Sequence, residues 1–164
     1  MDAEIYQLAA RVGAALKARK LMMSTAESCT GGWIGQAITM VPGSSSWFDR
    51  GFITYTNEAK QDMLGVRAET LRAFGAVSEQ TVREMVTGAL GKSRAQVAVA
   101  VSGIAGPDGG SISKPVGTVM LAWGQKGSEP HARPMHFAGD RDTVRRQSVI
   151  AALQGILSLL QSQS

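Results

Sequence analysis

The amino-acid sequence predicts an α/β domain with helices on both faces of a mixed sheet. Segments with helical periodicity alternate with short apolar or β-branched runs over the first two thirds of the chain. Two more strand-like runs then follow each other with no helix between them, which is typical of an antiparallel pair. A chain of 164 residues can bury one substantial core, so we expect residues 1–164 to form a single domain.

The first half of the chain contains clear capping and turn signals. Its helices begin after residues whose side chains can accept hydrogen bonds from the first helical amides, and its strands are short. In order, the expected elements are a helix capped by Asp2, a strand over residues 21–25, a helix opening at residues 30–32, a strand over residues 51–56 and a helix capped by Asn57 that runs through Leu64.

The second half contains the strand that we expect at the centre of the sheet. The run QVAVAVS at residues 96–102 is almost continuously apolar, as in a strand that is buried on both faces. A loop rich in glycine, proline and serine follows it. The other expected elements are a helix starting at Ser78, two strands over residues 118–123 and 133–137, and a last helix capped by Asp140.

The charge pattern favours a small anionic ligand over a nucleic acid. The chain has 17 basic and 13 acidic residues, a formal net charge of +4. The basic residues are scattered, except for Arg141, Arg145 and Arg146 near the carboxyl end. A nucleic-acid binder more often shows a dense basic stripe with interleaved aromatics. With only three Trp, two Tyr and four Phe, no such stripe can form here, and we expect no nucleic-acid partner.

Neither the cysteine nor the histidines predict a metal site. Cys29 is the only cysteine, so an internal disulfide and a cysteine-rich zinc site are excluded. His131 lies just before and His136 near the end of the strand predicted over residues 133–137, and at that spacing their side chains point to opposite faces. We therefore expect no metal. The amino end is acidic and the longest apolar stretch is short, so we expect a cytoplasmic protein with no membrane partner.

Three segments follow predicted strands at their carboxyl ends, where ligands bind in α/β folds: residues 26–32, 55–60 and 102–110. In the first, Ser28 lies just before a helix whose free amides favour negative charge. Such amides suit an oxyanion or a phosphate. The alternative is that Ser28 and Thr30 only cap the helix and that the glycines only turn the chain.

The second segment offers a base for Ser28. A serine hydroxyl needs a base before it attacks a carbonyl carbon, and the separated histidines leave lysine as the candidate. Lys60 lies in the first turn of a short helix, where the helix dipole and desolvation would lower its pKa. The alternatives are an exposed helix lysine and, for Tyr55, a core aromatic. This pair does not match the Tyr-x3-Lys of short-chain dehydrogenases, because four residues intervene and the chain has no G-x-G-x-x-G.

The third segment, with its glycines, could approach a ligand but lacks the ending of a Walker loop.

Six runs together resemble the CinA carboxyl-terminal domain family. They are TAESCTGG at 25–32, GSSSWFDRGFITYTNEAK at 43–60, GAVSE at 75–79, SGIAGPDGG at 102–110, KPVGT at 114–118 and GDRDTVRRQ at 139–147. The resemblance implies a three-layer α/β/α sandwich with a mixed, mostly parallel sheet, and a homo-oligomer. It also implies hydrolysis of nicotinamide mononucleotide to nicotinic acid mononucleotide and ammonia, without a metal or cofactor.

The resemblance also implies a role for each site residue. Ser28 would attack the carboxamide carbon, and Lys60 would take its proton and return it to the leaving ammonia. Tyr55 would orient Lys60 or contact the pyridine ring. Arg145 and Arg146 are equally well explained as exposed helix arginines. The binding part of the expected site comprises the backbone amides of Thr30, Gly31 and Gly32 around the oxyanion, and Ser102, Gly103 and Arg141 around the ribose phosphate.

Two other functions stay open at this point. The same loops could hold a nucleotide phosphate without cleaving any bond, which would make the chain a non-catalytic binding module. A DNA-associated role is suggested by the pI near 9.6 and by the family's competence and damage-inducible label. Release of ammonia would favour the enzyme over the binding module, whereas a salt-sensitive affinity for DNA would favour the third function.

Overall fold

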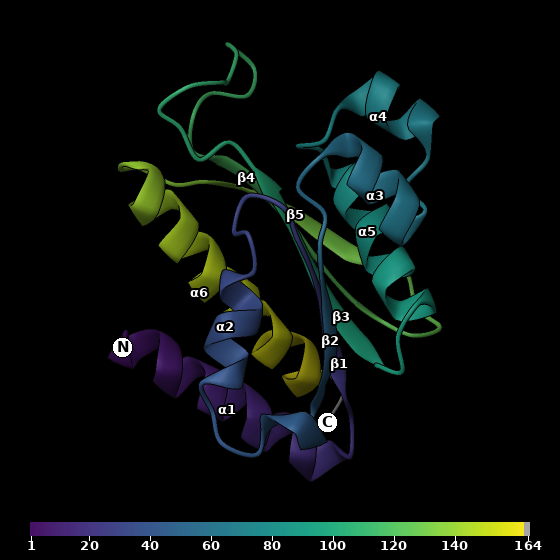
Figure 1. Ribbon diagram of the computed structural model, residues 1–164, viewed down its shortest axis with the longest axis vertical. Helices are drawn as coiled ribbons and strands as arrows, with labels where there is room; N and C mark the ends of the chain where they lie inside the picture. The colour runs from purple at the N-terminus through teal and green to yellow at the C-terminus, as the bar shows by residue number, and fades with distance from the viewer. Residues whose placement is uncertain (163–164) are drawn as a thin grey trace.

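Five strands form one mixed sheet in the computed structural model, which describes residues 1–162 (Figure 1). The strands are β1 (Met23–Glu27), β2 (Phe48–Ile53), β3 (Val97–Gly103), β4 (Thr118–Gln125) and β5 (His131–His136), in the spatial order β2-β1-β3-β4-β5. β1 pairs in parallel with both β2 and β3, while β3-β4 and β4-β5 are antiparallel. Only β4 is therefore reversed within the described sheet, which confirms a mixed, mostly parallel arrangement.

Helices cover both faces of the sheet, so the predicted three-layer α/β/α architecture is confirmed (Figure 1). One outer layer contains α1 (Ala3–Arg19), α2 (Trp33–Thr39) and α6 (Arg141–Gln161). The other contains α3 (Asn57–Leu64), α4 (Ala68–Phe74) and α5 (Glu79–Gly91). A single 3-10 turn at Ser44–Ser46 precedes β2.

Side-chain caps set the start of the long helices. Asp2 accepts from the amide of Ile5, Ser78 from that of Thr81, and Asp140 from that of Thr143, each three residues ahead. The caps Asp2 and Asp140 are as predicted, and Ser78, which was predicted to start a helix, caps α5. The cap of α3 differs, because the hydroxyl of Thr56 rather than the side chain of Asn57 accepts the first free amide.

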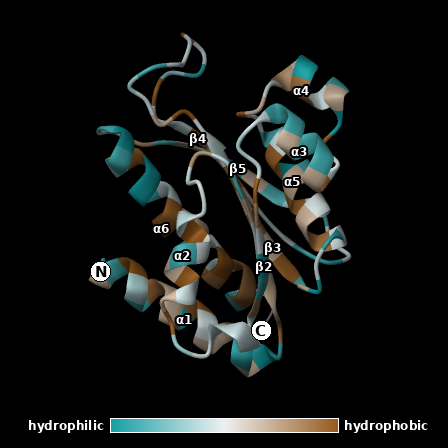
Figure 2. Cartoon of the chain, viewed as in Figure 1, coloured by the Kyte–Doolittle hydropathy of each residue, from teal (hydrophilic) through white to brown (hydrophobic). Residues whose placement is uncertain are grey.

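The sheet buries a core on each of its faces. β3 lies at the centre, and Val97 to Val101 are fully buried. Its valines belong to the core under α1, α2 and α6, and its alanines to the smaller core under α5. In Figure 2 the hydrophobic sides of the helices accordingly turn towards the sheet. No helix within residues 1–162 combines the length and apolarity needed to cross a membrane.

Some element boundaries differ from the sequence prediction. β1 runs on to Glu27, because its backbone pairs with β2 and β3 that far, even though the apolar run has ended. β2 begins at Phe48 rather than Gly51, since an edge strand pairs through its backbone and tolerates polar side chains such as Arg50. The short helix α4 was not predicted. It has no side-chain cap and is held by packing on α5, including a hydrogen bond from the Thr70 hydroxyl to Glu84.

Candidate active site

The turn that joins β1 to α2 lies at the carboxyl edge of the parallel strands. Ser28 is its first residue, and the Ser28 amide donates to the carbonyl of Val101 on β3 at 3.0 Å. The turn closes through Gly31 and Gly32, whose φ angles of 57° and 102° favour glycine. A side chain at Gly32 would also come within 3.0 Å of Ile53 at the end of β2. This local geometry places Ser28 between two neighbouring strand ends.

The side chains of Ser28 and Lys60 are in direct contact. Lys60 is the fourth residue of α3, and its Nζ lies 3.0 Å from the Oγ of Ser28. The amine also donates to the carbonyl oxygens of Thr54 at 2.8 Å and Tyr55 at 3.3 Å. Lys60 is 1% exposed and Ser28 is 7% exposed. The contact joins residues 32 positions apart and depends on the way α3 follows β2.

Burial shifts the pKa of the two titratable side chains next to Ser28, those of Lys60 and Cys29. Desolvation lowers the pKa of Lys60 below its ordinary value of 10.5, which favours the neutral amine. Desolvation also raises the pKa of the Cys29 thiol to about 11. A thiol is a nucleophile only when ionised, so Cys29 stays inert at neutral pH. A neutral amine within hydrogen-bond distance of a hydroxyl can act as the base that activates it.

The side chain of Glu27 binds the turn after β1 and the start of α2. Its buried carboxylate accepts from the Thr30 hydroxyl at 2.6 Å and from the amides of Gly32, Ile34 and Gly35 at 3.2, 2.9 and 3.0 Å. The amides at the start of α2 are therefore occupied by a side chain of the protein itself. Sequence reasoning missed this residue, although an acidic side chain just before a helix start is a recognised capping signal.

The amide groups of the turn divide into two sets. Among residues 1–162, Gly31 donates to the carbonyl of Ser28 at 3.0 Å and Gly32 donates to Glu27, whereas the amides of Cys29 and Thr30 have no hydrogen-bond acceptor. Thr30, Gly31 and Gly32 were all expected to offer amides to a ligand. Within the described structure, the amides that remain available are thus those one and two residues after Ser28.

A cavity of about 250 Å³ opens beside Ser28. Residues from all three predicted segments line it, together with two residues before α5 and the first residue of α6: Ser28, Cys29, Tyr55, Lys60, Ala76, Val77, Ser102, Gly103, Ala105 and Arg141. Gly103 allows β3 to approach its neighbours closely at this cavity, because a Cβ there would lie 3.2 Å from the Cys29 sulfur and 2.8 Å from Val119. Every side chain that the sequence placed in the expected site, apart from Thr30, lines this one cavity.

Tyr55 and Arg141 form the outer wall. Tyr55 is 59% exposed, so it is not the core aromatic considered above. Arg141 donates to the hydroxyl of Tyr55 at 3.3 Å and to the carbonyl of Gly106 at 2.8 Å. Arg141 also lines an adjoining cavity of about 370 Å³ between the loop after β3 and the start of α6. The two cavities share Ala105 and Arg141, which leaves the guanidinium between them.

The neighbouring arginines of α6 lie in different surroundings. Arg145 donates to the carbonyl oxygens of Cys29 at 3.0 Å and Thr30 at 3.2 Å. Arg146 instead pairs with Asp2 at 2.6 Å and Glu4 at 2.7 Å, which fastens the start of α1 to α6. Arg145 is therefore part of the turn after β1, whereas Arg146 holds two helices together.

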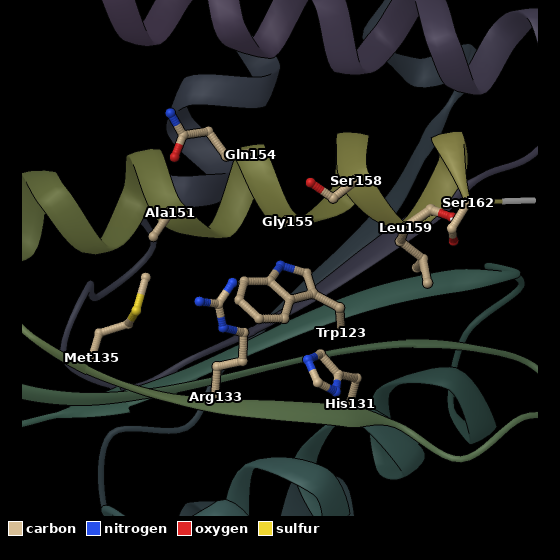
Figure 3. A pocket seen from close by; sticks show the side chains of 10 residues that line it. All are labelled: Trp123, His131, Arg133, Met135, Ala151, Gln154, Gly155, Ser158, Leu159 and Ser162. Atoms are coloured by element: carbon tan, nitrogen blue, oxygen red, sulfur yellow. The ribbon is translucent and has the colours of Figure 1, made fainter.

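A larger cavity lies elsewhere. It measures about 420 Å³ and lies between β4, β5 and the second half of α6 (Figure 3). Trp123 and Met135 from the strands line it, together with Gln154 and Ser158 from the helix. None of its serines is hydrogen-bonded to a lysine or histidine within residues 1–162. It therefore has no counterpart of the Ser28–Lys60 contact. The described chain also contains no group of three or more His, Cys, Asp or Glu residues that could hold a metal ion.

These features define a class: an α/β/α domain with a buried hydroxyl–amine pair at the carboxyl ends of parallel strands. The family described as the CinA C-terminal domain matches residues 5–160, and the chain belongs to that family. One relative, the nicotinamide-nucleotide amidohydrolase PncC of Escherichia coli (strain K12), is 58% identical over 153 residues, covering 93% of each chain. Its namesake from Pseudomonas putida is 55% identical over 155 residues, covering 94% of this chain and 96% of that protein. The crystal structure of the competence/damage inducible protein CihA from Agrobacterium tumefaciens superposes with a TM-score of 0.94 at 49% identity, covering 97% of both chains.

Proposed function

We propose that this chain is a nicotinamide-nucleotide amidohydrolase that converts nicotinamide mononucleotide and water to nicotinic acid mononucleotide and ammonia. The observation that carries the proposal is the 3.0 Å contact between the Lys60 amine and the Ser28 hydroxyl in a cavity at the carboxyl edge of the sheet. Relatives of matching length that are named for this activity supply the substrate. The reaction would belong to pyridine nucleotide recycling.

In the first step the Ser28 Oγ attacks the carboxamide carbon and Lys60 accepts the hydroxyl proton. The cationic pyridinium ring withdraws electrons and makes that carbon more electrophilic. Lys60 then passes the proton to the leaving ammonia, and an ester joins Ser28 to the nicotinoyl group. Water, activated by the same amine, cleaves the ester and regenerates the hydroxyl.

The contacts of Lys60 suit the neutral amine that this mechanism needs. A neutral amine has two N–H donors and one lone pair. The carbonyl oxygens of Thr54 and Tyr55 can take the two donors, which leaves the lone pair for the hydroxyl proton of Ser28. No carboxylate contacts the Nζ within residues 1–162, so the charged form gains no ion pair that would offset its desolvation.

The oxyanion would be held by the backbone amides of Cys29 and Thr30. These are the amides of the turn that have no acceptor in the described structure, whereas those of Gly31 and Gly32 are occupied. An amide aimed at the developing negative charge is worth more in a buried site than in water, because little solvent competes with it. The proposal therefore keeps Thr30 from the sequence-based assignment, adds Cys29, and leaves out Gly31 and Gly32.

The nucleotide would extend from Ser28 towards Arg141. Ser102 and Gly103 line the Ser28 cavity, where they would contact the ring and ribose, and Arg141 between the two cavities would pair with the phosphate. Tyr55 bonds Lys60 through its carbonyl oxygen and Arg141 through its hydroxyl, so it would link base and phosphate site.

The protein would act without a metal or cofactor, because the proposed steps use only an amine, a hydroxyl and backbone amides. Activity should therefore survive exhaustive dialysis against a chelator. Loss of turnover that a divalent ion restores would contradict this part of the proposal. A cytoplasmic location, a homo-oligomeric state, a single-domain organisation and the lack of a nucleic-acid partner stay predictions.

The proposal is tested by following ammonia release from nicotinamide mononucleotide. The wild-type protein should release one ammonia per nicotinic acid mononucleotide, and Ser28→Ala should lose turnover while keeping its affinity for the substrate. Ser45→Ala is the matched control, since Ser45 is exposed in the 3-10 turn before β2 and should behave as wild type. Binding without ammonia release would favour a non-catalytic nucleotide-binding module, and salt-sensitive DNA affinity would favour the DNA-associated role.

A further inference from the structure

We infer that Arg145 is a positioning residue for the oxyanion site, because it orients and polarises the peptide group that carries the Thr30 amide. The inference rests on the proposed function, because it concerns how the amides after Ser28 meet the substrate. Arg145 lies in the second turn of α6, more than a hundred residues from the turn that it contacts. It touches neither Ser28 nor Lys60, and it does not line the Ser28 cavity.

The guanidinium of Arg145 bridges two consecutive carbonyl groups of the turn. Its Nε donates to the oxygen of Cys29 at 3.0 Å, and its Nη2 donates to the oxygen of Thr30 at 3.2 Å. The carbonyl of Cys29 belongs to the same peptide plane as the amide of Thr30. One side of that plane is therefore bound by Arg145, while the other side carries an amide with no acceptor among the described residues.

The geometry of a trans peptide fixes where that amide points. In a trans peptide the N–H and C=O groups point in opposite directions. Since the Cys29 carbonyl faces Arg145 on the α6 side of the sheet, the Thr30 amide faces away from α6. Lys60 approaches Ser28 from α3, which belongs to the opposite layer. Rotation of this peptide would break the bond to Arg145 and turn the amide away from the reaction centre.

The positive charge adds a second effect. A hydrogen bond from an ionised donor is stronger than one between neutral groups and draws electron density towards the carbonyl oxygen. The peptide is then more polarised, and its N–H becomes a better donor. This effect grows in importance as negative charge develops on the substrate oxygen, so it should favour the transition state more than the bound substrate.

Arg145 is itself held in place on both sides. Its guanidinium lies 5.4 Å from the ring centroid of Trp33 in α2, and Asp142 lies 3.8 Å away in the preceding turn of α6. From the other side of the turn, Glu27 holds the amides of Gly32, Ile34 and Gly35. The positive charge of Arg145 thus binds carbonyl groups of the turn, and the negative charge of Glu27 binds amide groups. The amides of Cys29 and Thr30 remain available to a ligand.

The test compares Arg145→Met with Arg146→Met as a matched control. Both substitutions replace one arginine of α6 by an uncharged chain that cannot donate hydrogen bonds, but among residues 1–162 the side chain of Arg146 donates to Asp2 and Glu4 and not to the turn after β1. Arg145→Met should lower kcat by about ten- to a hundredfold, up to the loss seen when an oxyanion donor is removed. The substrate Kd, measured in the Ser28→Ala background, should change less than threefold. Arg146→Met should keep kcat within twofold of wild type.

Two readouts separate positioning from a structural role. The pH midpoint of kcat should stay that of wild type in Arg145→Met, because Lys60 keeps its surroundings. Arg145→Lys keeps the charge but not the two-carbonyl bridge, so its kcat should be intermediate. If Arg145→Met does not fold, a kcat of Arg145→Lys below that of wild type, with unchanged Kd, decides the question alone. A folded variant with wild-type kcat, or an equal loss in Kd and kcat, would overturn the inference. Full activity of both Ser28→Ala and Lys60→Met would instead overturn the proposed function.

Discussion

The parallel and antiparallel halves of the sheet differ in what their strand ends bring together. In the parallel half, β1, β2 and β3 end at the same edge, where Ser28, Tyr55 and Ser102 line one cavity of about 250 Å³. In the antiparallel half, β4 and β5 flank a larger cavity of about 420 Å³ that contains no serine bonded to a base. Strand direction, rather than cavity size, therefore indicates where the proposed active site lies.

The difference has a simple physical origin. Parallel neighbours place their carboxyl ends, and the turns that follow them, side by side, so residues far apart in sequence converge. Antiparallel neighbours alternate, and a side chain at the end of one strand lies beside the beginning of the next. Ser28 and Lys60 follow adjacent parallel strands, which is why 32 residues of separation become a 3.0 Å contact.

Removal of the base should cause the largest loss in the parallel half. Lys60→Met preserves the chain length but cannot accept a proton, so kcat should fall by about a thousandfold or more. Lys60→Arg should fail to the same degree, because a guanidinium stays protonated. Lys92→Met is the matched control, since Lys92 is exposed beyond the end of α5. Retention of most of the activity by Lys60→Arg would make this residue an electrostatic anchor rather than a base.

The pH profile should report the same amine. Burial lowers the pKa of Lys60 below 10.5, and only the neutral form can accept a proton. The kcat should therefore rise with pH through that lowered pKa and then level off. A fall in kcat as pH rises from neutrality would contradict a neutral lysine base.

The same pKa shift predicts a pH dependence of stability. The unfolded lysine titrates near ~10.4, so between the two pKa values the unfolded state binds more protons than the folded state. The free energy of unfolding should rise with pH across this window, and the rise should be absent in Lys60→Met. Denaturant unfolding over a pH series checks this, and identical slopes for both proteins would count against the shift.

A smaller and more selective effect is expected at the outer wall. Arg141→Ala should raise KM for nicotinamide mononucleotide by about ten- to a hundredfold, the range for losing a hydrogen bond to a charged group. Nicotinamide riboside lacks the phosphate, so its KM should change much less. Arg133→Ala, at the larger cavity, is the control and should affect neither substrate. Equal losses on both substrates would mean that Arg141 mainly supports Gly106 and Tyr55.

The smallest effect on activity is expected from the antiparallel half. A Cβ at Gly155 would lie 2.0 Å from the Trp123 ring, so Gly155→Ala should destabilise the fold by about 1–3 kcal/mol through overpacking. The kcat of the folded variant should stay within twofold of wild type. Thermal unfolding and ammonia release measure the two effects. A large loss of kcat without loss of stability would show that the larger cavity takes part in turnover.

Periodicity and capping residues predicted most of the architecture. The three caps Asp2, Ser78 and Asp140 are local signals, and each can be seen within a few residues of the chain. The alternation of helices and strands predicted the α/β class, with helices on both faces of the sheet. Helix α4 and the shifted start of β2 could not be predicted in this way. Both depend on backbone pairing or packing partners that lie elsewhere in the sequence.

The same difference between local signals and distant partners applies to the residues of the site. Ser28 and Lys60 follow strands and occur in runs that resemble a known family, so they could be named before the contact between them was seen. The roles of Glu27 and Arg145 depend on which amides and carbonyls of the turn are already occupied. Sequence reasoning therefore assigned the oxyanion to the amides of Thr30, Gly31 and Gly32. Only the hydrogen bonds indicate the amides of Cys29 and Thr30 instead.

The central claim, that Ser28 and Lys60 act as one unit, is tested most directly by the kcat of the double variant Ser28→Ala, Lys60→Met. Residues that work together in one proton transfer show grossly non-additive losses. We therefore expect the double variant to release ammonia from nicotinamide mononucleotide about as slowly as the slower of the two single variants. A kcat equal to wild type reduced by the product of the two single losses would show two independent residues, and would contradict the account.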